Sequence, residues 1–456
     1  MSSMEPFRIK LVEPLPKITK DERRRTIKDN NFNPFRLKDD DICFDLWTDA
    51  GTSSMSIHQW ASMLGTHEGS FNPTSFDTFI QNVASLTGFP HAQIHPVHQR
   101  SASEHTLFSI LAQPNLAIFS NSLHSAASKM DRMVGASVTN LPCTFINNGS
   151  FNGNLDCDRL DKELTRIPKH AVVILTVTSD GQSGQPVSMT NIKNVSQICK
   201  KWGVPLFMDG CRFAENAYFI KLRDERYVDS SARDIAKEMF SYCDGLYLAA
   251  HMDILCNVGG FFACRREDLF LNFIDTYKKI GSTRKHGGMA ARDLVAVTIG
   301  LTEGLEDRYL KYRIESLSTF GDILKKAGVP LVEPVGSAIY INAAKCLPHI
   351  PTEQYPAWAL HCALYVEGGI RCKHVGELQD VENNTQDNPQ HFLQICLPRR
   401  CYTFSQMLYI GEVFKCVLAQ KENILGLCLM QKATNPESIL FDTVGSCSVK
   451  SGTLEQ

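Results

Sequence analysis

The feature that most constrains the fold is an alternation of short apolar runs with helical patterns in the middle of the chain. Residues 172–178 form a β-branched apolar run, which a turn-rich segment joins to a helical pattern over 190–202. Further short apolar runs of the same character lie at 204–208, 245–248 and 260–263. Strands that alternate with helices favour a mostly parallel α/β sheet.

Two charged residues fall where such a sheet binds its ligands. Asp209 directly follows the run 204–208, and Arg212 comes three residues later. Ligands of open α/β sheets bind beyond the carboxyl ends of the strands. An Asp after a buried strand is, however, more often a helix cap or a turn residue. From spacing alone, both interpretations of Asp209 remain open.

Composition narrows the class of protein. A chain of 456 residues with 43% hydrophobic content can bury a large core, divided between two subdomains. Its 47 Lys and Arg residues balance 49 Asp and Glu residues, without the long basic run that nucleic-acid or anionic-membrane partners favour.

Targeting and redox signals point to a cytoplasmic location. The charged amino terminus lacks the apolar core of a secretory signal, and the longest apolar stretch, 254–264, is shorter than the roughly 20 residues that a bilayer requires. The 16 cysteines are scattered without a zinc-type spacing, which predicts reduced thiols.

Two longer motifs carry a specific resemblance. The segments GQPVS at 184–188 and FMDGCRFAENAYFIK at 207–221 strongly resemble those of the aromatic amino acid beta-eliminating lyases, tryptophanase and tyrosine phenol-lyase. Similar segments run from PFRIKLVEP at 6–14, through LWTDAGTSSMS at 46–56, to LPRRCYT at 397–403. The resemblance covers nearly the whole chain.

The resemblance implies a fold and an organisation. It predicts an α/β protein with the type I fold of pyridoxal-phosphate (PLP) dependent transferases, similar to aspartate aminotransferase: a large domain with a mostly parallel seven-stranded sheet, plus a smaller α+β domain. The expected boundaries are an N-terminal arm and part of the small domain at 1–50, the large domain at 51–310, the small domain at 311–443 and a disordered tail at 444–456. Family members are usually tetramers built from dimers, so a homo-oligomer is expected.

The resemblance also implies an activity, which is PLP-dependent β-elimination on an aromatic L-amino acid or analogue. Asp209 matches the carboxylate that pairs with the pyridinium nitrogen of the cofactor, and Arg212 matches the arginine beside its phenolic oxygen. Arg399 matches the arginine that binds the substrate carboxylate. Gly51, Glu68 and Asn257 align with a potassium site.

The main departure from the family lies in LYLAAHMD at 246–253. Met252 falls on the Schiff-base lysine, and a thioether can neither form an imine nor take a proton from an α-carbon. His251 replaces a second lysine and Ala249 replaces a serine, both of which contact the cofactor phosphate in the family.

Other cofactor contacts change as well. The family's phosphate loop HQGRG is HQRSA here, so Ser101 replaces the arginine, while Arg100 beside Gln99 is one residue out of register and would have to move to restore the charge. His124 replaces the aromatic residue that stacks on the ring. Asp180 replaces an asparagine that donates to the cofactor oxygen.

The groups that act on the leaving group also differ. The tyrosine that serves as general acid falls near Ser70 or Phe71, and a tyrosine that lines the pocket becomes His286. Val375 stands where tyrosine phenol-lyase has an arginine that reads the phenol, which is closer to tryptophanase.

Three hypotheses follow. The chain is a pseudoenzyme that keeps the lyase fold, or an enzyme with altered chemistry that binds PLP or a PLP-amino acid adduct noncovalently, or a non-catalytic subunit of a hetero-oligomer. The second hypothesis keeps Asp209, Arg212 and Arg399 and needs a new base, for which the candidates are His251, His286 and Lys285. Each candidate base also has a structural interpretation, as an ordinary pocket residue or a solvated loop charge.

Overall fold

A computed structural model describes most of the chain: residues 5–9, 11–50, 55–67, 73–111, 116–122, 136–146, 149–166, 170–178, 180–279, 287–375, 391–431 and 436–444. It divides into two compact units. Unit 1 comprises Met1–Pro6 and Ala50–Ile314, and unit 2 comprises Phe7–Asp49 and Glu315–Gln456. The predicted tail from 444 onward lies outside the described residues except for Val444.

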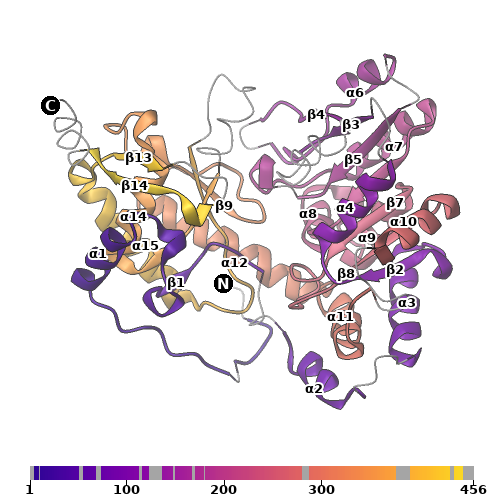
Figure 1. Cartoon of the computed structure of the whole chain (residues 1–456), viewed down its shortest axis with the longest axis horizontal. Coiled ribbons are helices and arrows are strands. Elements are labelled where there is room, and N and C mark those ends of the chain that lie inside the picture. Colours follow the sequence, from indigo (N-terminus) through magenta and orange to yellow (C-terminus); the bar gives the residue numbers. More distant parts are fainter. Residues whose placement is uncertain are drawn as a thin grey trace. The chain divides into compact units, whose positions relative to one another are not determined.

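Unit 1 is built on a seven-stranded sheet with the order β2-β8-β7-β6-β5-β3-β4 (Figure 1). Its strands are β2 (Ile94–Val97), β3 (Ala117–Ser120), β4 (Ser137–Asn140), β5 (Ala171–Thr176), β6 (Leu206–Asp209), β7 (Gly245–Ala249) and β8 (Gly260–Cys264). Strand β8 runs antiparallel to both of its neighbours, while the pairings from β7 to β4 are parallel. The predicted mostly parallel, seven-stranded sheet is confirmed.

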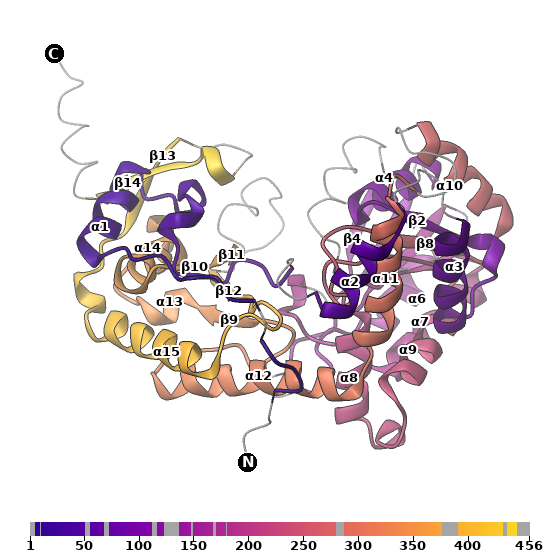
Figure 2. The ribbon, with the colours of Figure 1, turned by 90° about the horizontal axis from the view of Figure 1, so that it is seen from below.

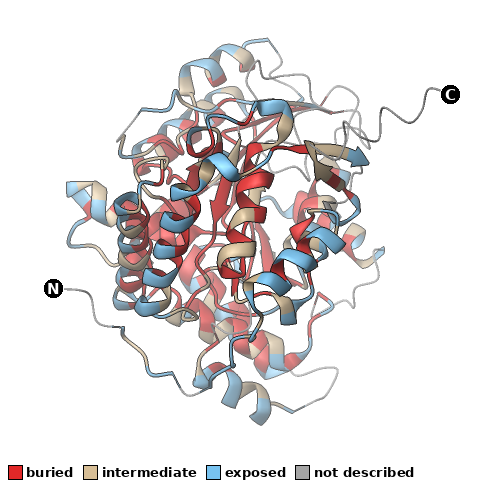
Figure 3. Ribbon diagram, turned by 90° about the vertical axis from the view of Figure 1, so that its left-hand side faces the viewer, coloured by how far each residue is buried: buried red, intermediate tan, exposed pale blue. Residues whose placement is uncertain are grey.

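Helices cover the faces of this sheet (Figure 2). They are α2 (Ile57–Gly65), α3 (Pro73–Thr87), α4 (Arg100–Leu111), α6 (Cys157–Leu164), α7 (Met189–Trp202), α8 (Phe213–Arg223), α9 (Ala232–Ser241), α10 (Glu267–Lys279) and α11 (Ala291–Glu303). One core cluster joins α4 and α10 to the strands, and in it the ring of Phe262 stacks on that of Phe273 at 3.7 Å. Strands β2, β3, β6, β7 and β8 are buried along their whole length, whereas the edge strand β4 carries exposed residues at both ends. Figure 3 colours the buried segments of the chain red and the exposed segments of its helices pale blue.

The predicted helix at 190–202 is confirmed as α7, and its ends show why it forms there. Ser188 caps its amino end by accepting a hydrogen bond from the Asn191 backbone N–H. Gly203 ends it with a left-handed φ of 68°, a conformation that glycine adopts without strain. The helix therefore starts and stops at local signals in the sequence.

Unit 2 is assembled from both ends of the chain. β1 (Phe44–Asp45) pairs in parallel with β10 (Ile370–Arg371), and β11 (Lys373–Val375), β12 (Phe392–Ile395) and β9 (Ile339–Asn342) form an antiparallel sheet. β13 (Leu427–Gln431) and β14 (Leu440–Thr443) form a second antiparallel pair. The helices are α1 (Lys20–Asp29), α13 (Ala343–Cys346), α14 (Pro356–Gly368) and α15 (Phe404–Ala419), and α12 (Asp307–Lys326) contains the boundary with unit 1.

The cysteines and helices bear on two of the expectations. Among the cysteines that the structure describes, fourteen are free, as expected, but the expectation of reduced thiols is wrong for Cys428, which is disulfide-bonded. Of the helices in the described ranges, none combines the length and apolarity needed to cross a bilayer.

A buried histidine pair lies in the core of unit 2. His361 of α14 accepts a hydrogen bond at Nε2 from the Cys372 backbone N–H at 2.9 Å. Its Nδ1 lies 3.1 Å from Nε2 of His374, whose ring stacks on Trp358 at 4.1 Å. Because Nε2 of His361 is an acceptor, Nδ1 carries the proton and donates to His374. The pair is held in its neutral form.

This pair predicts acid sensitivity. Burial, together with the neighbouring His374 and Arg371, holds the pKa of His361 well below its usual value. The folded chain then binds fewer protons than the unfolded chain below pH 6.5, so stability falls as the pH drops. One such histidine costs about 2 kcal/mol between pH 7 and pH 5. Urea unfolding measures the free energy of unfolding at pH 7 and pH 5 for the unmutated protein and for His361→Gln. The loss of this free energy between the two pH values should be smaller in the variant by about 2 kcal/mol. Equal losses in the two proteins would contradict the neutral state of His361.

Candidate functional site

Asp209 and Arg212 lie where the sequence predicts, at the carboxyl end of the sheet. β6 ends at Asp209, and α8 begins directly after Arg212. The buried Asp209 carboxylate accepts a hydrogen bond at Oδ1 from the Cys211 backbone N–H at 3.3 Å. The structural interpretation of Asp209 as a turn residue is therefore correct in part, but this bond engages only one of its oxygens.

The second oxygen of Asp209 is ion-paired with Arg100. Nη2 of Arg100, the first residue of α4, lies 2.9 Å from Asp209 Oδ2 and 3.4 Å from Oε1 of Glu104. Asp209 and Glu104 are each 3% exposed at the side chain, and Arg100 is 19% exposed. Arg100 thus bridges two buried carboxylates.

Sequence reasoning missed Glu104. Acidic and basic residues four apart on a helix are neighbours, and HQRSASE has this spacing from Arg100 to Glu104. That signal could have indicated that Arg100 turns toward the sheet. Ser101 and Gln99, by contrast, are exposed.

Arg212 belongs to a second buried charge cluster. Its Nη1 lies 3.8 Å from Oε2 of Glu215, and the Nε of Arg313 donates to Oε1 of the same carboxylate at 2.9 Å. All three side chains are at most 4% exposed. This cluster fixes the start of α8 beneath the carboxyl end of β6.

Met252 lies in the turn after β7. The next residue, Asp253, accepts hydrogen bonds at Oδ2 from the backbone N–H groups of Ala214 at 2.7 Å and Glu215 at 3.2 Å, at the amino end of α8. The turn that contains Met252 and His251 is thereby tied to the same edge of the sheet as Asp209. Both side chains are partly exposed.

A glutamine that sequence reasoning did not single out holds the loop after this turn. Nε2 of Gln59, fully buried on α2, lies 3.1–3.4 Å from the backbone oxygens of Ile254, Leu255 and Ala296. The loop leads to Asn257, which is exposed. Gln59 therefore positions the loop without reaching the carboxylate cluster.

In unit 2, Arg399 is paired with a carboxylate of its own unit. Its Nη1 donates to the backbone oxygen of Asp49 at 2.9 Å and to Asp49 Oδ2 at 3.0 Å, and both side chains are at most 2% exposed. Asp49 belongs to the motif LWTDAGTSSMS, but its pairing with Arg399 spans 350 residues of sequence. No local pattern could have predicted it.

Two predicted site residues lie at the ends of short elements: Asp180 begins the short helix η5 (Asp180–Gln182), and Val375 ends β11. Seven further predicted site residues lie outside the described residues: Gly51, Glu68, Ser70, Phe71, His124, Lys285 and His286. The potassium site stays a prediction, and within the described ranges no group of three His, Cys, Asp or Glu residues is placed to hold a metal.

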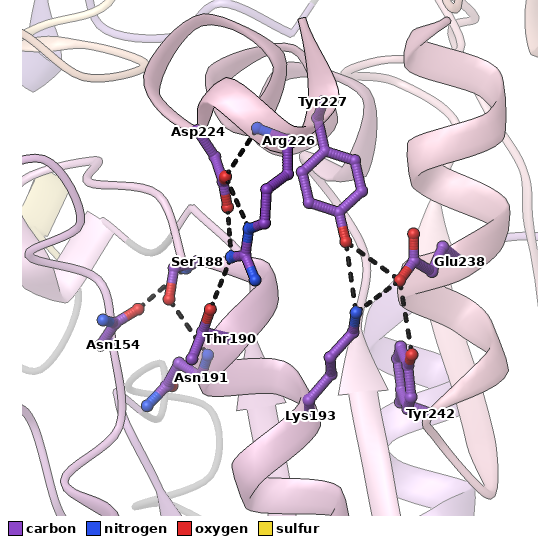
Figure 4. A network of polar contacts seen from close by, with 10 residues as sticks. All are labelled: Asn154, Ser188, Thr190, Asn191, Lys193, Asp224, Arg226, Tyr227, Glu238 and Tyr242. Carbon is purple, nitrogen blue, oxygen red and sulfur yellow. Dashed lines mark hydrogen bonds and ion pairs between the residues drawn. The ribbon is translucent and has the colours of Figure 1, made fainter. Parts of the chain in front are cut away.

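The motif GQPVS has a structural role. Figure 4 shows Ser188 between Asn154 and Asn191: the Ser188 backbone N–H donates to Asn154 Oδ1 at 2.8 Å, and its hydroxyl caps α7. Further along α7, Lys193 forms an ion pair of 2.8 Å with Glu238, to which Tyr227 also donates. Ser188 of the motif therefore helps to start α7, and the ion pair of Lys193 holds α7 against α9.

Comparison with known proteins identifies the family. The model of the beta-eliminating lyases matches residues 45–412. The tryptophanase of Salinibacter ruber is 39% identical over 93% of this chain and 91% of its own length, and the tyrosine phenol-lyase of Clostridium tetani is 35% identical over 92% and 93%.

Solved structures agree on the fold. A serine palmitoyltransferase of Sphingomonas wittichii superposes with a TM-score of 0.61 over 89% of this chain and 97% of its own, at 12% identity. One from S. paucimobilis, solved with a bound PLP-myriocin aldimine, gives 0.60 over 89% and 97%, at 13% identity. The predicted type I fold is confirmed. On these grounds, the chain belongs to the beta-eliminating lyase family, together with the tryptophanases and tyrosine phenol-lyases.

Proposed function

We propose that this chain is a beta-eliminating lyase in fold but not in activity, a pseudoenzyme that has lost covalent PLP catalysis. The observation that carries the proposal is Met252 in the turn tied to the edge of the sheet where Asp209 lies. The family places there a lysine that forms an imine with the cofactor and moves the α-proton of the substrate. A thioether carries no exchangeable proton and no nucleophilic amine.

The neighbouring residues do not fit a phosphorylated cofactor bound in the family's manner. Ala249 and His251 replace the serine and lysine that contact the phosphate, and Ser101 replaces the arginine of the phosphate loop. Arg100 does not restore that charge, because its guanidinium is ion-paired with Asp209 and Glu104. The loss of several groups that serve one function supports a change of role rather than a single compensated substitution.

An assay of β-elimination tests the proposal. The purified protein is incubated with PLP and one amino acid at a time: L-tryptophan, L-tyrosine or L-cysteine. Pyruvate is measured over hours. The expected result is no pyruvate above that released by PLP alone, while the Salinibacter ruber tryptophanase, assayed in parallel, turns over. Pyruvate release that depends on the unmutated protein would instead support an enzyme with altered chemistry.

We also propose that the chain self-associates. Helix α2 presents Ile57, Trp60 and Leu64 on one side, and these side chains are 55%, 42% and 87% exposed. Their spacing of three and four residues places them in one apolar stripe. The opposite side of α2, with Gln59, faces its own unit. Exposed apolar stripes of this kind mark association surfaces.

Light scattering coupled to size-exclusion chromatography tests this surface. The unmutated protein should elute as a dimer or tetramer, and Trp60→Glu with Leu64→Glu should shift it toward the monomer. A matched control, His58→Glu, changes an exposed polar residue of the same helix and should leave the assembly unchanged. A monomeric unmutated protein would contradict the proposal.

A further inference from the structure

The ion pair between Arg100 and Asp209 occupies the place of a different partner. In the family this carboxylate pairs with a protonated pyridine nitrogen, so a cation is expected there. Here the cation is part of the chain: Nη2 of Arg100 lies 2.9 Å from Asp209 Oδ2, and the Cys211 backbone N–H engages Oδ1. Both oxygens of Asp209 therefore already accept from donors of the protein itself.

The surroundings hold this guanidinium in place. Glu104, one turn along α4, lies 3.4 Å from the same nitrogen and is buried. Burial alone would lower the pKa of the Arg100 guanidinium. The electrostatic effect of Asp209 and, to a smaller extent, of Cys211 and Glu104 is larger in sum, so this pKa is raised well above its usual value. The buried carboxylates of Asp209 and Glu104 share this cation, so removal of Arg100 would take the compensating positive charge from both of them.

The loop sequence explains how the arginine comes to lie there. Relative to the family's HQGRG, the arginine of HQRSA stands one position earlier, at the first residue of α4, and the exposed Ser101 takes the family position. A shift of one residue on a helix turns a side chain by about 100°. The one-residue shift of the arginine therefore has two effects: Ser101 stands at the position of the family's phosphate-binding arginine, and the guanidinium of Arg100 contacts Asp209.

We propose that Arg100 is an internal substitute for the pyridinium of PLP, which occupies Asp209 and closes this half of the site to the cofactor ring. A pyridinium could bind only by displacing the guanidinium from Asp209, its shorter ion pair, and leaving it with the longer contact to Glu104. Restoring the lysine at position 252 is then insufficient for cofactor binding. The inference rests on the proposed function in that both explain a missing cofactor, but it names a separate cause.

Cofactor affinity in matched variants tests the inference without any assay of activity. All proteins carry Met252→Lys and Ser101→Arg, and they differ only at position 100: Arg, Lys or Met. The Kd of PLP is measured by equilibrium dialysis, with a benzene analogue that has the aldehyde and phosphate but no ring nitrogen as a second probe. Arg100→Met should bind PLP at least 30-fold more tightly than the parent, Arg100→Lys should remain weak, and the benzene analogue should show no such gain.

Equal PLP affinity with Arg, Lys and Met would overturn the inference, as would an equal gain for the benzene analogue, because the charge at Asp209 would then be irrelevant. A double-mutant cycle of melting temperatures in the unmutated background, with Arg100→Met and Asp209→Asn, covers the case in which a variant folds poorly. The double variant should lose less melting temperature than the sum of the losses in the two single variants, because both remove the same ion pair. A loss equal to that sum would also overturn the inference. Pyruvate release by the unmutated protein would instead contradict the proposed function, whichever result Arg100 gives.

Discussion

Substitution of Arg313 by alanine is expected to lower the free energy of unfolding by about 3–5 kcal/mol. The Nε of Arg313 donates to Oε1 of Glu215 at 2.9 Å, and the two side chains are 2% and 1% exposed. Removing the guanidinium leaves a buried carboxylate with less compensating charge, since the ion-pair distance from Arg212 to this carboxylate is longer, at 3.8 Å. Urea unfolding followed by circular dichroism measures the loss.

A second variant separates the charge from the packing at this position. Replacing the whole cluster, with Arg212→Met, Arg313→Met and Glu215→Leu, removes the buried carboxylate together with both cations that contact it. This triple variant should be more stable than Arg313→Ala, since apolar side chains of similar volume often substitute for buried ion pairs at little cost. A single variant that loses less than about 1 kcal/mol, the range of a surface ion pair, would show that Arg313 is effectively solvated.

Substitution of Arg399 by alanine should destabilise unit 2 by a similar amount, about 3–5 kcal/mol. In the family this arginine binds the substrate carboxylate, but here Nη1 donates to both the backbone oxygen and Oδ2 of Asp49. A residue that serves only to bind substrate could be removed at little cost in stability. We therefore expect a large loss in the absence of any ligand.

The control for Arg399 is its neighbour. Arg400→Ala removes the same kind of side chain from the same LPRR motif, at a position that is less buried, and should cost less. Thermal unfolding of both variants, with and without an amino acid at millimolar concentration, gives the comparison. An Arg399→Ala variant as stable as the unmutated protein would contradict the structural role and favour a ligand-binding one.

The fold could be predicted because its signals are local or shared by the family. The apolar run before Asp209, the cap at Ser188 and the glycine at 203 fix elements within a few residues of sequence. The long motif around Asp209 then identifies the topology. The positions of Asp209 at the end of β6 and of Arg212 just before α8 could be predicted because the signals for these two elements are also local.

The site chemistry could be predicted only in part. Comparison of HQRSA with the family motif HQGRG indicates that Arg100 is out of register, but not which way its side chain turns, and the partner Asp209 is 109 residues away in sequence. The pairing of Arg399 with Asp49 is equally non-local. Such ion pairs depend on how strands and helices meet, which periodicity does not encode.

We propose that this chain cannot move the α-proton of an amino acid, because Met252 stands where the family resemblance places the lysine that does so. Proton NMR in D₂O measures this step directly, by the loss of the α-proton signal of L-tryptophan, L-tyrosine or L-cysteine in the presence of PLP and the unmutated protein. We predict that the signal decays no faster with the protein than with PLP alone. Exchange that grows in proportion to protein concentration would contradict the account and show that another group takes the proton.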